Sequence, residues 1–243
     1  MNIKLIIQYD GTNFCGSQVQ KNQRTVQQEL DSALEKLFGQ KITSVFSGRT
    51  DSGVHAKAQT VNFITDSPSS VPPEKIKHPL NNMLPRDILV LSSEPVEDGF
   101  NSRFDAKKRT YRYFIRKTPE LFRSKYSLFY PHEIDTDRLN SAAGLFKGRK
   151  DFTAFCSAQA EVKNHVCDVT QLHFFRENDE IVMEISANRF LHNMVRIIVS
   201  VFLELNRNRI SENDILNIFE KKNRCLSPKT ISPKGLFLWK VEY

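Results

Sequence analysis

The chain has 243 residues, which is near the upper limit for a single hydrophobic core, so one large or two modest domains are expected. Its composition, 40% hydrophobic and 26% charged, is ordinary for a globular protein and argues against a largely disordered chain. The formal net charge of +7 favours a polyanionic partner, because a basic surface accelerates encounters with phosphate-bearing molecules.

No apolar stretch of the sequence has the length of a membrane span. The longest, Leu191 to Leu205, is interrupted by polar residues and falls short of the roughly 20 residues required. The apolar run at the start is too short for a signal peptide, and the four cysteines form no Cys-x-x-Cys pair. Cys156, His165 and Cys167 lack a fourth ligand at a zinc-like spacing, so we expect core cysteines and no metal. We predict a cytoplasmic protein without a membrane partner.

The first half of the chain predicts elements in the order β-α-β-β-α-β. Alternating apolar residues from Ile3 to Tyr9 indicate a strand, and Thr25 with Gln28 forms a capping box for a helix that ends at Gly39. The remaining expected elements are strands at 42–47 and 58–64, a short helix opened by Pro72-Pro73 and weakened by Pro79, and a strand at 88–91. This order is that of a ferredoxin-like unit.

A polar, non-periodic segment at 101–107 suggests a domain boundary, which we place between an N-terminal domain, 1–104, and a C-terminal domain, 105–243. The expected elements beyond it are a strand at 111–116, a helix at 135–147, strands at 166–176 and 179–187, a helix from about 188 to 205, a helix opened by Ser211 with Asp214, and a closing strand at 235–243 that joins the second sheet. Both halves are therefore expected to be α+β.

The segment from Ser47 to Gln59 presents a lone carboxylate, Asp51, between Gly48 and Gly53. The glycines allow sharp turns, so Asp51 is expected at an accessible tip in a loop between paired strands. Arg49 and Lys57 bring positive charge to the tip, which favours an ionised Asp51 ready to act as nucleophile or base. The alternative is an ordinary turn with a solvated ion pair.

The segment from Lys107 to Lys117 contains six basic residues and three aromatic residues. Such a ribbon suits RNA, because cations neutralise phosphates while an aromatic face stacks on an unpaired base. The alternative is an edge strand kept soluble by charge, with Tyr111 and Tyr113 packed on a sheet.

The predicted helix from 188 to 205 carries Arg196 among mostly apolar neighbours. Arg189, His192, Arg196 and Ser200 recur at spacings of three and four, which predicts a polar stripe along that helix. A guanidinium in such surroundings requires an anion, and Asp51 or a substrate phosphate would supply it. A structural pair with another carboxylate, or an exposed stripe, is the alternative.

These segments resemble the motifs of the TruA family of tRNA pseudouridine synthases. Ser47–Gln59 resembles the Gly-Arg-Thr-Asp-Ala-Gly-Val-His signature, Lys108–Tyr113 the second motif, and Phe190–Arg196 the third. Further matches, in family order across almost the whole chain, are Tyr9-Asp-Gly11, Asp151–Phe155 and Pro233–Leu238. By this resemblance Asp51 is the catalytic residue, Tyr111 stacks on the target uracil, and Arg196 pairs with the aspartate.

Two positions depart from the family pattern. Ser52 replaces the usual alanine after the aspartate, a small and conservative change. Cys15-Gly-Ser17-Gln18 stands where an aromatic-Gly-Trp-Gln pattern is usual. We expect the loss of this indole to affect local packing or one RNA contact rather than the chemistry.

The resemblance implies an isomerase that converts uridine to pseudouridine at positions 38, 39 and 40 of the tRNA anticodon stem-loop, and a homodimer. It also implies a pseudouridine synthase fold of two ferredoxin-like or RRM-like α+β units with mainly antiparallel sheets. Arg49 would occupy the space left by the extruded nucleotide or grip the backbone. Asp51 would attack the sugar or deprotonate C2′, and the sequence leaves both open. The reaction involves neither redox nor group transfer, so no cofactor is expected.

The remaining RNA contacts expected are Lys107, Lys108, Arg109, Arg112 and His55. We expect His55 to organise the Asp51 loop by hydrogen bonding or to touch RNA, rather than to act as an acid or base. Two rival functions remain at this stage. One is a non-catalytic RNA-binding module with the same fold, and the other is a hydrolase that uses Asp51 and His55 but lacks an identifiable oxyanion hole.

Overall fold

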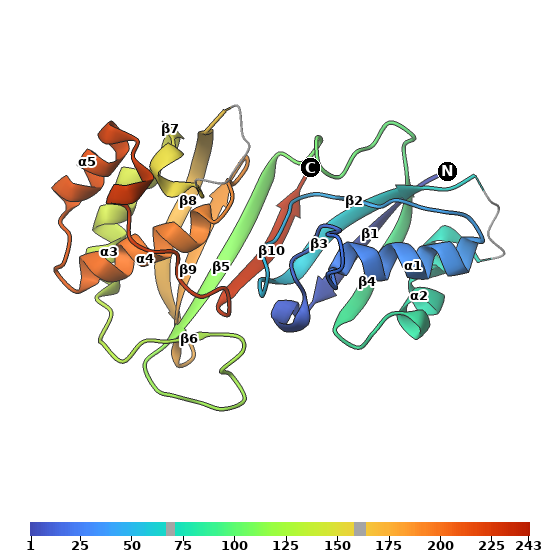
Figure 1. Ribbon diagram of the computed structural model, residues 1–243, viewed down its shortest axis with the longest axis horizontal. Coiled ribbons are helices and arrows are strands. Elements are labelled where there is room, and N and C mark those ends of the chain that lie inside the picture. Colours follow the sequence, from blue (N-terminus) through green and yellow to red (C-terminus); the bar gives the residue numbers. More distant parts are fainter. Residues whose placement is uncertain (67–70, 158–163) are drawn as a thin grey trace. The chain divides into compact units, whose positions relative to one another are not determined.

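The computed structural model describes residues 1–66, 71–157 and 164–243 (Figure 1). These residues form two compact units, one made of Met1–Lys107 with Phe237–Tyr243 and the other of Lys108–Leu236. The chain thus leaves the first unit after Lys107 and returns to it with its last strand. That residues 1–104 and 105–243 are separate domains stays a prediction.

The first unit is built on β1 (Asn2–Tyr9), which pairs antiparallel with β3 (His55–Ile64) on one side and β4 (Ile88–Val96) on the other. β2 (Val45–Phe46) pairs antiparallel with β3, and β10 (Leu236–Glu242) pairs parallel with the start of β3. Ile3, Leu5 and Ile7 are completely buried, which confirms the predicted alternation of β1.

Two helices complete the β-α-β-β-α-β order of the first unit, as predicted. α1 (Val26–Phe38) begins where the Thr25 side chain accepts a hydrogen bond from the Gln28 N–H, and ends at Gly39 in the left-handed conformation. α2 (Lys77–Met83) tolerates Pro79, because the first turn of a helix has no partner for its N–H groups. Short 3₁₀ turns lie at Gly11–Asn13 and Pro73–Lys75.

The second unit contains a sheet in the order β5-β9-β8-β7, all antiparallel neighbours, with β6 parallel to β5. The strands are β5 (Lys108–Arg116), β6 (Leu128–Phe129), β7 (Gly148–Asp151), β8 (Val166–Glu177) and β9 (Glu180–Ala187). The helices are α3 (Thr136–Ala143), α4 (Met194–Asn206) and α5 (Glu212–Lys221), with 3₁₀ turns at Gly144–Phe146, Thr153–Phe155 and Arg224–Leu226. The expected α+β class is confirmed, and the Ser211–Asp214 capping box is present.

The predicted helix start at 188 is wrong, because α4 begins at Met194. Asn193 precedes it with a φ of +64°, a left-handed conformation that asparagine tolerates and that an α-helix cannot continue through. Arg189 and His192 therefore lie before the helix, and the predicted polar stripe is reduced to Arg196 and Ser200. Arg196 lies in the first turn instead of the middle of the helix.

Cys156 and Cys167 are buried in the second unit, with 2% and 0% of their surfaces exposed. Burial raises the pKa of both thiols, that of Cys167 to about 11, so each remains protonated. Their predicted place in the core is confirmed.

Asp31 is an acidic residue on α1 whose carboxylate receives hydrogen bonds from Ser44, one from the N–H at 3.0 Å and one from the hydroxyl. It is half-buried, and burial raises its pKa to about 6, although the Ser44 hydrogen bonds oppose the shift. The folded state therefore holds a proton on Asp31 at a pH where the unfolded chain, with a pKa near 3.8, has released it.

This stabilising contribution is complete below about pH 4 and is lost as the pH rises through about 6. Asp31→Asn keeps an oxygen acceptor without the charge, so we expect it to raise the free energy of unfolding at pH 8 by on the order of 1–2 kcal/mol. The gain should vanish at pH 4. Urea titrations from pH 4 to pH 8 measure it, with Glu35→Gln on the exposed side of α1 as the control for lost charge. A difference independent of pH would contradict this account.

Candidate active site

Asp51 lies in the loop between β2 and β3, at residues 47–54, as the sequence predicts. The loop closes with a turn in which the Val54 N–H donates to the Asp51 carbonyl at 3.1 Å, and Gly53 supplies the left-handed conformation with φ +76°. The Asp51 side chain is half-buried and Arg49 is exposed. This loop therefore presents a carboxylate and a guanidinium at the surface of the first unit.

A buried polar network lies beneath the Asp51 loop. The Tyr9 hydroxyl is 2.8 Å from the hydroxyl oxygen of Thr50, and the Gln59 amide donates to the Gly48 carbonyl at 2.8 Å while accepting from the Ser47 hydroxyl. Burial raises the pKa of Tyr9 to about 12, so its hydroxyl stays neutral. Sequence reasoning missed this network, although the Tyr9-Asp-Gly11 motif was a signal for it.

Gly11 and His55 join the end of β1 to the start of β3. A Cβ on Gly11 would lie 2.0 Å from the Val54 carbonyl oxygen, so the close approach requires glycine. The His55 Nδ1 lies 3.0 Å from the Gly11 nitrogen and 3.1 Å from Asp10 Oδ1, and its ring stacks on Phe237 at 4.6 Å. His55 is 1% exposed, and these contacts join Asp10 and Gly11 to the start of β3. That it organises the Asp51 loop stays a prediction. Its contact with RNA stays a prediction.

The residues that depart from the family pattern adjoin the same loop. Ser17 is buried and exchanges two hydrogen bonds with Thr50, while the Ser52 hydroxyl donates to the Phe14 carbonyl at 3.2 Å. Cys15 is half-buried, and its thiol lies 2.8 Å from the side-chain oxygen of Gln23. Both serines therefore act on the local structure of the loop.

The Tyr111 side chain lies on β5 in the second unit and is 7% exposed. Its ring meets Phe190 edge-to-face, with centroids 5.0 Å apart and an interplanar angle of 83°. Tyr113 is fully buried, and its hydroxyl donates to the Ser232 carbonyl at 2.7 Å. The alternative interpretation of this segment, in which its tyrosines pack on a sheet, is correct for Tyr113. Burial raises the pKa of the Tyr113 hydroxyl.

Arg196 is held by specific acceptors in the second unit. Its Nε donates to the Ile231 carbonyl at 2.8 Å and its Nη1 donates to the side-chain oxygen of Asn193, also at 2.8 Å. Burial raises the pKa of Tyr113, and the positive charge of Arg196 opposes that rise. A cation gains nothing from the N-terminus of a helix, so the position of the guanidinium depends on acceptors such as these two.

The cations of the basic ribbon, residues 107–117, differ in exposure and in whether they bind groups of the protein itself. Lys107 is exposed, and Lys108 and Arg109 are half-buried, with Arg109 donating to the Asn188 carbonyl at 2.7 Å. Arg112 pairs with Glu184 at 2.6 Å and with Glu177 at 3.3 Å. Its charge is therefore already compensated within the protein, and its role in RNA binding stays a prediction.

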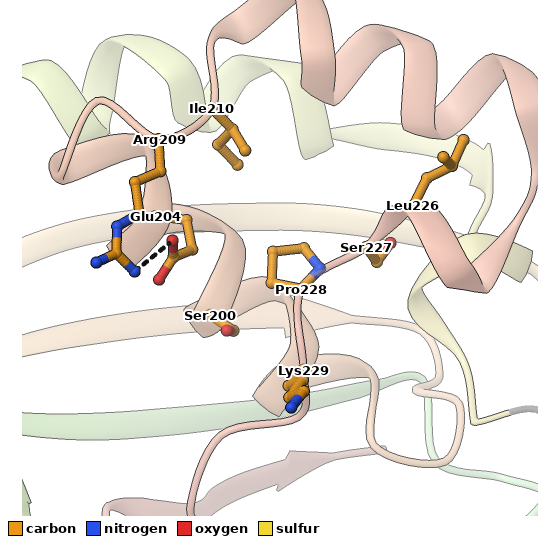
Figure 2. A pocket seen from close by; sticks show the side chains of 8 residues that line it. All are labelled: Ser200, Glu204, Arg209, Ile210, Leu226, Ser227, Pro228 and Lys229. Carbon is orange, nitrogen blue, oxygen red and sulfur yellow. Dashed lines mark hydrogen bonds and ion pairs between the residues drawn. The ribbon is translucent and has the colours of Figure 1, made fainter.

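A shallow hollow in the second unit is lined by part of α4 and the segment after the last 3₁₀ turn (Figure 2). Glu204 lies in it, with Arg209 at 3.4 Å, and Lys229 also lines it. None of the residues predicted for catalysis lines this hollow. The described part of the chain contains no group of three or more metal-ligating side chains and no helix long and apolar enough to cross a membrane.

The structure thus places Arg49, Asp51 and His55 in the first unit, and Tyr111 and Arg196 in the second. The protein-family model described as tRNA pseudouridine synthase matches residues 5–105 and 142–243 of the chain. The chain therefore belongs to the tRNA pseudouridine synthase family, whose members isomerise uridine in tRNA.

Curated relatives match the chain over its whole length. The chain is 42% identical to "tRNA pseudouridine synthase A" of Bacillus licheniformis and 40% identical to that of Bacillus subtilis strain 168, each over 247 residues that cover 100% of this chain and 99% of the relative. The protein of the same name from Clostridium acetobutylicum is 39% identical over 244 residues, covering 100% and 99%.

Gly11→Ala tests the close approach that holds the Asp51 loop. The added Cβ meets the Val54 backbone, so we expect the free energy of unfolding to fall by about 1–3 kcal/mol or more. Gly48→Ala, in the same loop, is the control, because a Cβ there would meet no heavy atom within 4 Å. Urea unfolding of both variants measures the difference, and equal losses would show that the approach to Val54 is not the constraint.

Proposed function

We propose that the protein isomerises uridine to pseudouridine at positions 38, 39 and 40 of the tRNA anticodon stem-loop, with Asp51 as the catalytic residue. The observation that carries this proposal is the Asp51 loop: a half-buried carboxylate on a backbone held from beneath by Tyr9 and Gln59. The full-length similarity to proteins named tRNA pseudouridine synthase A supports the tRNA substrate.

The chemistry requires that uracil be detached from C1′ of its ribose, rotated, and rejoined through C5. The nucleotide must first leave its stack, which costs a few kcal/mol. Exposed Arg49 would fill the vacated space or grip the backbone, and Tyr111 would stack on the extruded uracil. Arg196 would pair with Asp51, whose carboxylate attacks the sugar or removes the C2′ proton. The isomerisation transfers no electrons or groups between molecules, so the mechanism uses no cofactor.

The proposal includes the cytoplasm as the site of action and a homodimer as the working form. The dimer is supported by exposed apolar side chains in the loop after β5, where Leu121 is 80% exposed and Phe122 is 83% exposed. Burial of these two side chains in a subunit interface would remove their apolar surface from water.

Asp51→Asn tests the assignment of the catalytic residue. The amide is nearly isosteric but is neither a nucleophile nor a base, so we expect no turnover, while tRNA affinity stays within about three-fold of wild type. The measurement is tritium release from tRNA transcripts labelled at C5 of uridine. Three transcripts are compared, each of which keeps a uridine at only one of the positions 38, 39 and 40.

Each other result of this experiment has a defined meaning. Full activity of Asp51→Asn would remove Asp51 from the chemistry. Tight tRNA binding without tritium release by the wild type would favour the RNA-binding module, and release of free uracil or cleaved RNA would favour a hydrolase. Release from transcripts that lack uridine at all of positions 38–40 would contradict the proposed target positions.

The basic ribbon predicts that tRNA affinity falls steeply with salt, because each neutralised phosphate releases counterions. Lys107→Ala should reduce the slope of log affinity against log salt by about 1. Lys117→Ala is the matched control at the other end of the ribbon, since Lys117 is already paired with Glu133 and should leave the slope unchanged. Filter binding from 50 to 300 mM KCl measures the slopes, and a flat profile for the wild type would contradict the electrostatic argument.

A further inference from the structure

Ser17 binds both backbone polar groups of the residue that precedes Asp51. The Ser17 hydroxyl accepts a hydrogen bond of 2.9 Å from the Thr50 N–H, and the Ser17 N–H donates one of 3.1 Å to the Thr50 carbonyl. Ser17 is 1% exposed and Thr50 is 6% exposed, so water does not reach these groups readily. Ser17 therefore constrains the orientation of the Thr50 backbone through both of its polar groups.

Gly16 brings the two segments into direct contact. Its φ is +98°, and a Cβ built on it would lie 2.8 Å from the Thr50 carbonyl oxygen and 3.5 Å from the carbonyl carbon of Asp51. A side chain at this position would push the segment away from the loop. The backbone of residues 16–17 thus packs against the peptide that joins Thr50 to Asp51.

Ser52 holds the other side of the loop more weakly. Its hydroxyl donates to the Phe14 carbonyl at 3.2 Å, and the Gly53 N–H donates to the same carbonyl at 3.3 Å. Because Ser52 is exposed, water replaces its hydrogen bond at little cost. The Thr50 N–H is buried and would lose its partner if the Ser17 hydroxyl were removed, so Ser17 is the stronger constraint.

We propose that Ser17 is a positioning residue for the isomerisation: its hydroxyl fixes the Thr50 amide and thereby the direction in which the Asp51 carboxylate points. This inference rests on the proposed function, in which Asp51 reacts with the ribose. A serine hydroxyl suits the task because it accepts from an N–H without adding charge beside the carboxylate. Ser17 acts through the backbone and contacts no substrate.

Ser17→Ala removes the acceptor while keeping the backbone. A displacement of about 1 Å at a reacting group lowers turnover by up to about 100-fold, so we expect kcat to fall by about 10- to 100-fold while KM for tRNA stays within about two-fold. Ser17→Thr retains the hydroxyl acceptor and should recover most of kcat. Steady-state tritium release from tRNA transcripts labelled at C5 of uridine gives both constants.

Ser93→Ala separates positioning from stability. Ser93 is 5% exposed on β4 in the same unit, and its hydroxyl also accepts from a backbone N–H of another segment, that of half-buried Lys77, at 3.2 Å. We expect both serine variants to lower the thermal midpoint by similar amounts and only Ser17→Ala to lower kcat. Equal losses of kcat in the two variants would overturn the proposal.

Asp51→Asn in the same assay distinguishes the failure of this inference from the failure of the proposed function. An inactive Asp51→Asn with a wild-type kcat for Ser17→Ala would overturn the role of Ser17 alone. An active Asp51→Asn would overturn the function of Asp51 and the role of Ser17 with it. If Ser17→Ala does not fold, Ser17→Cys carries the test, because its weaker acceptor should give an intermediate kcat and a wild-type value would overturn the proposal.

Discussion

The buried hydrogen bond between Tyr9 and Thr50 is the interaction on which the Asp51 loop depends, since it ties the tip of the loop to the central strand of the first unit. Tyr9 is 3% exposed at the end of β1, and its hydroxyl requires a partner where water is excluded. A hydrogen bond in such surroundings contributes about 1 kcal/mol, but leaving either hydroxyl unpaired costs about 1–3 kcal/mol. The loop therefore keeps its conformation mainly because breaking this hydrogen bond would leave a buried hydroxyl unpaired, and less because of the stability that the bond itself adds.

Several independent contacts converge on the same short loop. Gln59 holds Gly48 from β3, Gly11 meets Val54 from the end of β1, and the segment at 14–17 binds Thr50 and Gly53. These contacts restrict the conformations that the backbone of the Asp51 loop can adopt, because each one removes a direction in which it can move. Arg49, at the surface of the loop, remains exposed.

In the second unit, Asn193 orients the Arg196 side chain. Asn193 takes a left-handed conformation, and α4 begins at the next residue, Met194. The side-chain oxygen of Asn193 accepts a hydrogen bond from the Arg196 guanidinium. The same residue therefore ends the preceding loop and orients the guanidinium. The buried Tyr113, bound to the Ser232 carbonyl, ties β5 to the segment that also accepts from Arg196.

The sequence by itself determined the α+β class, the order of the first unit's elements and the caps of α1 and α5, because periodicity and capping are local properties of the chain. The residues proposed for the site came from the resemblance of short motifs to those of the family. The start of α4 depends on the positive φ of Asn193, and the spacing of apolar residues in the sequence does not reveal a backbone conformation of this kind. The contacts of Ser17 and Tyr9 with Thr50, and of His55 with Phe237, join segments far apart in sequence. Only the tertiary structure determines these contacts, because they depend on which segments pack together. Packing excludes water, and the buried polar groups then need hydrogen-bond partners from neighbouring segments.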